Sequence, residues 1–295
     1  MSNKIFSISS AFVLGASFAV ADVPKVAVDI APVHSLVSKV MNGLGKPNLI
    51  IPSEASPHEY QLRPSEAKAL QEAKLVFWIG EDLTPWLEKG LSTLAKDATI
   101  TTLLKADGIE LLDFREGALF EAHDHSDHDD HDDHDDHDHG KHKKKDDHDD
   151  HEGHDHGEHD PHAWLSPGIA KVWLNLIAAK LSEVDPSNAS TYFSNASSAN
   201  KDLDSLSDEI NKILDPIRKE KFVVFHDAYQ YFENHFNISA SGAISLGDAS
   251  DPSPARLKEI KERFEKEDIH CVLAEPQYNE GLVKAVIEGT HANNA

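Results

Sequence analysis

Short apolar runs alternate with amphipathic segments along the first third of the chain. Residues 74–80, for example, are apolar and rich in aromatic and β-branched side chains, as buried strands are. The segments between such runs place apolar residues at helical spacing, as at Val33, Val37 and Val40. Alternating strands and helices predict a parallel sheet covered on both faces. The expected strands cover 25–30, 47–52, 74–80 and 99–103, and the expected helices cover 33–41, 64–73 and 84–94.

A long helix is expected to separate this first lobe from a second one. Residues 186–214 carry an apolar stripe that includes Leu203, Leu206 and Ile210. A helix of this length spans about 40 Å at 1.5 Å per residue, which is enough to join two lobes. A shorter helix that starts at Ser166–Pro167 precedes it. The expected strands of the second lobe cover 221–226, 238–245 and 270–276, and its helices cover 227–236, 253–267 and 279–289.

The predicted fold is therefore α/β, with two parallel-sheet lobes joined by a long rigid helix. We expect an N-terminal lobe at 22–185, a linking helix at 186–215 and a C-terminal lobe at 216–295. A crossover helix normally leads into another strand. We expect that the residues after 289 are too few to form that strand. We therefore expect a truncated second lobe with a vacant edge on its sheet.

The segment at 121–160 consists almost entirely of histidine and acidic residues. It holds 18 of the 52 acidic residues and 4 of the 28 basic ones. The resulting net charge of −14 is more than half of the formal net charge of −24 of the whole chain. With almost no apolar side chain to bury, the segment cannot repay its ordering entropy, which predicts a disordered loop. This charge excludes nucleic acid as a partner, since nucleic acid needs a basic surface, and suits a protein that attracts cations.

The first 21 residues have the parts of a secretory signal peptide. Lys4 supplies the positive start, a short apolar stretch follows, and small residues fit cleavage before Asp22. The apolar stretch is short and broken by Ser and Gly, unlike a membrane anchor. We therefore expect a free periplasmic protein that is not embedded in a membrane. The single cysteine, Cys271, has apolar flanks that predict burial in a strand rather than catalysis.

Three histidines outside the acidic segment have placements that suit a shared metal ion. His58 follows a proline in the loop after an expected strand, and His162 follows Pro161 where the chain enters a helix. His226 ends the expected strand 221–226, and open α/β sheets bind ligands at the carboxyl ends of strands. Three neutral imidazoles suit Zn²⁺. A lone histidine is more often a surface or capping residue, and sequence spacing alone does not prove that the three converge.

Four segments carry a resemblance to a known family. They are SPHEYQLRPSEAKALQEAKLVFWIGE, DPHAWLSP, FVVFHDAYQYFE and CVLAEPQ. The chain resembles the periplasmic zinc-binding proteins of ABC importers, the ZnuA-type group within the metal-binding cluster of solute-binding proteins. The resemblance implies two α/β lobes joined by a long helix, with a metal cleft between them. It also implies His58, His162 and His226 as the metal ligands, and the membrane permease of an ABC zinc importer as the partner.

The sequence departs from the family pattern in two places. Some zinc-specific relatives have a glutamate before the first histidine, where this chain has Pro57. Family members also continue past residue 290 into a further strand and helix, with an aspartate near the site and a cysteine that pairs with the one at Cys271. The fourth ligand therefore stays open between water, Glu59 and a histidine of the acidic segment. Manganese-binding relatives have a carboxylate at the position that matches His226, so an imidazole there favours Zn²⁺.

We expect a monomeric periplasmic protein that captures Zn²⁺ as its transported ligand, delivers it to an ABC importer and catalyses no reaction. The alternatives are a binder of Mn²⁺ or Cu²⁺, or a metal-dependent hydrolase. The hydrolase is disfavoured because the HDHSDH pattern at 123–128 lies in a repetitive run, and because Leu62 stands where an H-E-x-x-H motif from His58 needs histidine. The acidic segment either scavenges metal or is a solvated spacer. Its candidate loose ligands are His123, His125, His128, His131, His134, His137, His139, His142, His148, His151, His154, His156 and His159.

Overall fold

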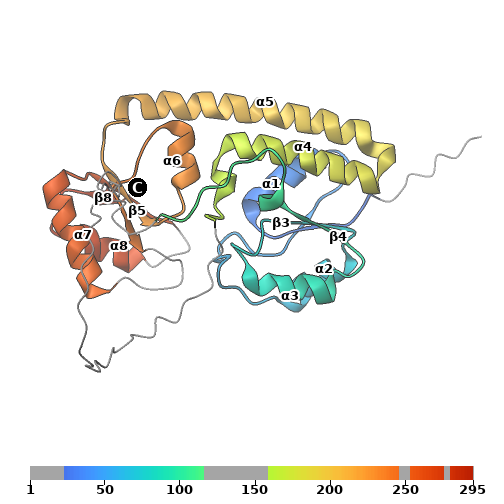
Figure 1. Ribbon diagram of the computed structural model, residues 1–295, viewed down its shortest axis with the longest axis horizontal. Helices are drawn as coiled ribbons and strands as arrows, with labels where there is room; N and C mark the ends of the chain where they lie inside the picture. The colour runs from blue at the N-terminus through green and yellow to red at the C-terminus, as the bar shows by residue number, and fades with distance from the viewer. Residues whose placement is uncertain (1–22, 116–158, 246–252, 276–279, 295) are drawn as a thin grey trace, which may run out of the picture.

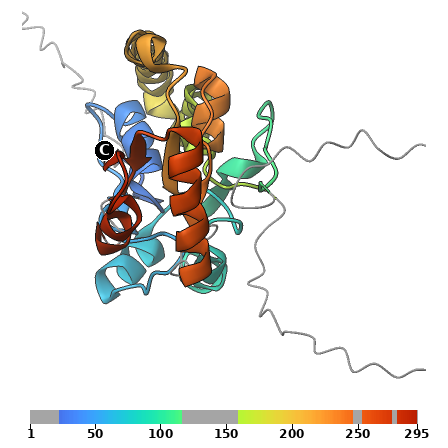
Figure 2. The ribbon, with the colours of Figure 1, turned by 90° about the vertical axis from the view of Figure 1, so that its left-hand side faces the viewer.

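The computed structural model describes residues 23–115, 159–245, 253–275 and 280–294. They form two α/β lobes that lie side by side, and one long helix, α5 (Ala189–Leu214), runs along both (Figure 1). Figure 2 looks onto the second lobe, whose orange and red helices lie in front of the blue first lobe. The expected fold class, two parallel-sheet lobes joined by a long helix, is confirmed.

The first lobe is built on a four-stranded parallel sheet. Its strands are β1 (Val26–Val28), β2 (Asn48–Leu49), β3 (Leu75–Trp78) and β4 (Thr99–Thr102). Its helices are α1 (Ala31–Val40), α2 (Pro64–Glu72), α3 (Pro85–Leu94) and α4 (Pro167–Val184), with short 3-10 helices η1 (Leu103–Lys105) and η2 (Ala163–Leu165). The strand order is β2-β1-β3-β4, and every residue of β1 and β3 is buried. In Figure 1, α1 and α4 lie on one side of these strands and α2 and α3 on the other.

The second lobe repeats this arrangement. Its strands are β5 (Phe222–His226), β6 (Ala243–Ser245), β7 (Cys271–Leu273) and β8 (Asn293–Asn294), and its helices are α6 (Gln230–Phe236), α7 (Pro254–Glu267) and α8 (Glu280–Ile287). The order β6-β5-β7-β8 is that of the first sheet, and all the pairs are parallel. Both sheets therefore present the carboxyl ends of their first and third strands at the centre of one edge.

The edge of the second sheet beside β7 is not vacant, so that expectation is wrong. Asn293 and Asn294 pair with Cys271 and Val272, and the Asn293 N–H donates to the His270 carbonyl at 2.9 Å. The crossover helix α8 returns the chain to this edge, and backbone pairing there needs no apolar side chain. Asparagine is depleted in strands, which is why the hydrophobic pattern gave no sign of β8.

Helix α5 is fixed to the first lobe and then continues toward the second. It packs against α4 and α1, and the Asn195 side chain donates to the carbonyls of Val40 and Asn42, both at 2.9 Å. At 26 residues it spans about 39 Å. Short 3-10 helices, η3 (Pro186–Asn188) and η4 (Asp215–Ile217), stand at its two ends. Among the described residues, no helix is both long and apolar enough to cross a membrane.

A second stretch of chain also connects the lobes. Residues 106–115 leave the first lobe and lie against α6, where the Leu112 N–H donates to the Tyr231 hydroxyl at 3.0 Å. The returning chain pairs with it, because Asp113 and His159 form an antiparallel bridge. The expected loop at 121–160 lies largely outside the described residues. It differs from the structure at its end, since His159 is paired and Asp160 is buried.

The buried carboxyl of Asp29 ties two strand ends of the first lobe together. Its Oδ1 accepts the Ile30 N–H at 2.8 Å, and its Oδ2 accepts the Ile79 N–H at 2.7 Å, just beyond β3. Burial raises the pKa of Asp29 to about 7, although the two N–H donors oppose the rise. Above pH 7 the group is therefore ionised, and both oxygens accept.

Replacing Asp29 with asparagine is expected to lower the free energy of unfolding at pH 8 by about 1–3 kcal/mol. The amide –NH₂ cannot accept, so one buried backbone N–H loses its partner. Urea unfolding of the two proteins measures the difference. Asp107, which is exposed, provides the control, and Asp107→Asn should stay within about 0.5 kcal/mol of the unchanged protein. Equal stability of the Asp29→Asn variant would show that the carboxyl does not bind both strands as described.

Candidate metal centre

His58 lies in the loop that joins β2 to α2 in the first lobe. The Trp86 indole N–H donates to the Pro57 carbonyl at 2.9 Å, which fastens the loop to α3. The His58 N–H donates to the Ser56 hydroxyl at 3.3 Å. The loop is thus fixed immediately before the histidine, and the ring is left half-buried at the edge of the cavity described below.

His162 is buried at the point where the returning chain enters η2. Asp160, two residues earlier, accepts from both its backbone N–H at 2.9 Å and its ring Nδ1 at 2.7 Å. The Tyr231 hydroxyl, from the second lobe, donates to the Asp160 carbonyl at 2.8 Å. A carboxylate can only accept, so Nδ1 carries the proton and Nε2 keeps its lone pair.

His226 is the last residue of β5, and its ring is oriented in the same way. Its Nδ1 lies 2.6 Å from Oε1 of Glu275, which follows the neighbouring strand β7. Tyr229 also hydrogen-bonds Glu275. Burial, followed by the charge of Glu275, raises the pKa of Tyr229 well above its usual range, so the phenol stays a donor. The Nε2 atom of His226 therefore keeps its lone pair, with which it can bind a cation.

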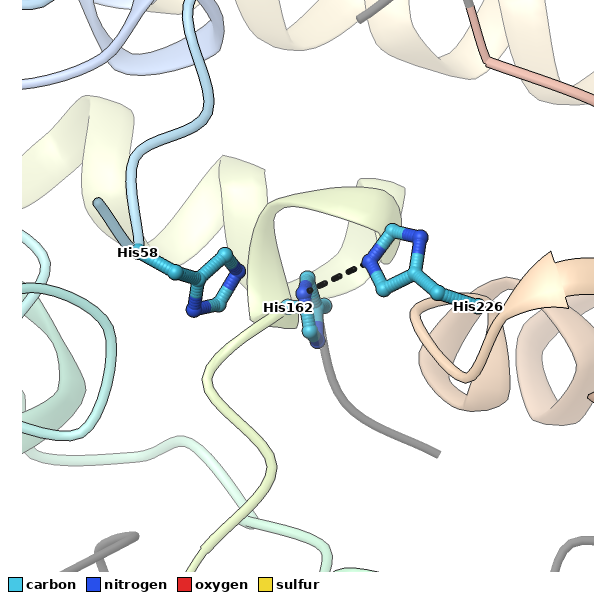
Figure 3. A group of neighbouring side chains, drawn as sticks. All are labelled: His58, His162 and His226. Atoms are coloured by element: carbon cyan, nitrogen blue, oxygen red, sulfur yellow. Dashed lines mark hydrogen bonds between the residues drawn. The ribbon is translucent and has the colours of Figure 1, made fainter. Parts of the chain in front are cut away.

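The three imidazoles converge between the lobes, as Figure 3 shows. One ring nitrogen from each of His58, His162 and His226 lies within 4.8 Å of the other two. The Nε2 atoms of His162 and His226, joined by the dashed line, are 3.4 Å apart. Two lone pairs at that distance repel unless a cation lies between them. Zn–N bonds of about 2.0–2.1 Å at a tetrahedral angle place two ligand nitrogens about 3.3–3.4 Å apart, so the spacing fits Zn²⁺.

The histidines open into a cavity of about 220 Å³ between the lobes. Its first-lobe wall is largely apolar, with contributions from Ile30, Pro32 and Trp164. Its second-lobe wall includes Tyr229 and Glu275. The low dielectric of such a wall strengthens the attraction between a bound cation and the two carboxylates behind the rings.

The structure does not bring every predicted ligand to this centre. Glu59 is exposed and lines a surface depression with His58, Tyr60 and Trp86, but its carboxylate is not part of the group of three histidines. The His159 ring lies 2.9 Å from Asp113 and is also outside the group. The other loop histidines, at 123–156, lie outside the described residues.

The sequence-based prediction missed Asp160 and Glu275, the two carboxylates that orient the rings. Each had a signal. Asp160 lies two residues before the candidate ligand His162. An aspartate side chain often accepts a hydrogen bond from the backbone N–H two residues later in the chain. Glu275 follows an apolar strand that neighbours the strand of His226, and the carboxyl ends of adjacent parallel strands meet at one edge.

Comparison with known proteins agrees with this architecture. The family model described as zinc-uptake complex component A, periplasmic (ZnuA) matches residues 26–295. A high-affinity zinc uptake system protein ZnuA from Brucella abortus is 45% identical over 270 residues, which cover 90% of this chain and 81% of that protein. The ZnuA protein of Paracoccus denitrificans is also 45% identical, over 92% of this chain and 81% of its own length. A crystal structure of ZnuA has a TM-score of 0.71 at 22% identity and covers 92% of this chain and 89% of that one, a likeness of fold. The chain therefore belongs to the ZnuA family of periplasmic zinc-uptake components.

Proposed function

We propose that this protein captures Zn²⁺ at His58, His162 and His226 and delivers it to the membrane permease of an ABC zinc importer. The observation that carries the proposal is the convergence of three ring nitrogens within 4.8 Å between the lobes. The relatives named as high-affinity zinc uptake proteins support it, since they are 45% identical over most of the chain. The proposal includes a periplasmic location, as the family description says, and a monomer without catalytic turnover.

The chemistry of the centre favours zinc. Three neutral imidazoles suit Zn²⁺ better than Mn²⁺, which prefers oxygen ligands. The carboxylates of Asp160 and Glu275 stand behind two of the rings, so their two negative charges balance a divalent cation without occupying its coordination sphere. With Glu59 outside the group, water is the ligand that best completes a tetrahedral site.

The placement of the ligands suits capture and release. His58 and His162 belong to the first lobe and His226 to the second, so a bound ion joins the lobes. Movement of the lobes apart would therefore take His226 away from the other two ligands. Both carboxylates beside the rings accept from ring nitrogens, which leaves them poorly placed to act as the general base of a hydrolase.

Competition titrations with Zn²⁺ and Mn²⁺ test the metal assignment. A chelator stronger than single histidines isolates the tight site from loose ones. We expect one tight Zn²⁺ per chain and Mn²⁺ binding at least about a hundredfold weaker, since imidazole ligands disfavour the harder ion. Equal affinity for the two metals would contradict the proposal. Transport into vesicles that contain the permease then tests delivery.

Zinc binding is expected to weaken at least about tenfold between pH 7.5 and pH 5.5. Only neutral imidazole binds a metal, and free imidazole takes up a proton near pH 6.5, so protons compete with the ion as the pH falls. The sign is therefore loss of affinity with acid, with protons released on binding. Calorimetry in buffers of different ionisation enthalpy measures both quantities. Unchanged affinity at the lower pH would exclude ligation by histidine.

A further inference from the structure

Arg115 reaches from the connecting segment 106–115 onto the second lobe. Its Nε lies 3.0 and 3.1 Å from the two carboxylate oxygens of Asp227. Its Nη1 and Nη2 donate to the two oxygens of Glu233 at 2.9 and 3.0 Å, and Nη2 also contacts Asp227. The arginine side chain is 18% exposed, and the two carboxylates are 9% and 4% exposed. The guanidinium is thus bidentate to two largely buried anions.

These two anions hold the turn that presents His226. Asp227 is the next residue in the chain, and Glu233 lies on α6, the helix that follows the turn. Glu233 also accepts the Ala240 N–H at 3.0 Å, near the start of β6. Arg115 therefore joins the residue beside the candidate ligand to the helix and loop behind it.

The same small region also supports His162. The Leu112 N–H, three residues before Arg115, donates to the Tyr231 hydroxyl, and that hydroxyl donates to the carbonyl of Asp160. The Asp160 N–H donates back to the Leu112 carbonyl at 2.8 Å. Asp160 in turn orients the His162 ring. Segment 106–115 is thus connected by hydrogen bonds to the supports of two candidate ligands in different lobes.

The charges explain why the position needs arginine. The carboxylates of Asp227 and Glu233 are both largely buried, and the Arg115 guanidinium forms ion pairs with both of them. Without the guanidinium, two buried carboxylates would face each other without compensation, a costly arrangement. A lysine supplies the charge but not the planar, bidentate geometry.

We propose that Arg115 is a positioning residue for zinc binding, which fixes the turn of His226 against the first-lobe side of the site. This proposal rests on the proposed function, since it assumes that His226 binds the metal. It assigns a role in metal affinity to a residue outside the coordination sphere.

Arg115→Gln in the full chain is expected to weaken tight Zn²⁺ binding about 10-fold. This is the low end of the range for losing a group that contacts a ligand, because Arg115 acts on His226 through Asp227 and Glu233. Arg115→Lys should lie between this variant and the unchanged protein. Arg218→Gln is the matched control, because Arg218 also bonds a carboxylate, that of Asp215. Its other acceptors are the Asn211 amide oxygen and the Phe236 carbonyl. None of these partners is one of the three converging histidines. It should change zinc affinity less than about twofold while lowering the melting temperature.

A double-mutant cycle separates positioning from general destabilisation. In the His226→Ala background, Arg115→Gln should cost less than about twofold, because its effect passes through His226. The role of Arg115 is overturned if Arg115→Gln lowers the zinc affinity equally in both backgrounds. It is also overturned if Arg115→Gln alone leaves the zinc affinity unchanged. If His226→Ala itself leaves tight binding intact, the proposed function fails instead. Should Arg115→Gln not fold, Arg115→Lys carries the same cycle, with the same two outcomes.

Discussion

Replacing His226 with alanine is expected to weaken tight Zn²⁺ binding by more than about a hundredfold. Loss of an outer-shell support costs 10–100-fold, and loss of a ligand itself should cost more. Of the three converging histidines, His226 is the one from the second lobe, so its removal should disconnect a bound ion from that lobe. Competition with a chromophoric chelator, which masks loose sites, measures the change.

His34 provides a control for this prediction. It is partly buried in the same protein, and its ring Nε2 lies 3.2 Å from the Pro47 carbonyl, away from the group of three. His34→Ala should leave the zinc affinity within about twofold of the unchanged protein, since it removes no ligand or support. If the two alanine variants bind zinc equally well, the tight site does not include His226.

Deleting residues 123–156 is expected to reduce the zinc bound at saturation from several ions per chain to one. The segment contains 12 histidines among carboxylates, which we expect to form many weak sites, whereas the three converging histidines lie outside it. Elemental analysis after dialysis at rising free Zn²⁺ measures the stoichiometry. The deletion spares His159 and Asp160, so the bridge to Asp113 and the support of His162 are retained.

A full-length variant with those 12 histidines changed to asparagine separates chemistry from chain length. It should also bind one ion tightly, because it lacks the imidazoles but keeps the spacing and the acidic residues. If the deletion abolishes the tight site and the asparagine variant keeps it, the segment matters for the fold of the site. If both lose it, the tight ion is bound by the segment and the proposed centre is wrong.

The alternation of apolar runs and amphipathic segments was enough to predict both sheets, because buried parallel strands and their covering helices have distinct periodicities. Strand β8 could not be predicted in this way. It consists of Asn293 and Asn294, whose side chains carry no strand signal, and it forms by backbone pairing with β7. The expected loop includes Asp160, which the structure buries. A polar side chain gives no sign of burial in the hydrophobic pattern, and Asp160 is buried together with its hydrogen-bond partner, the His162 N–H.

The candidate site could be predicted in part. A proline before His58 and before His162, and a strand end at His226, indicated the three residues, but only the packing of two lobes shows that their rings meet. The roles of Asp160 and Glu275, which orient two of the rings, depend on the directions in which their side chains point. The spacing of residues in the sequence does not give those directions. Arg115 is further removed, because its partners lie 112 and 118 residues later in the chain.

Anomalous diffraction at the zinc edge, from crystals of the full chain with one equivalent of Zn²⁺, tests the central claim most directly. The account predicts one principal peak, bonded at about 2.0–2.1 Å to a ring nitrogen of each of His58, His162 and His226. A principal peak elsewhere, or one bonded to fewer than two of these rings, would contradict it.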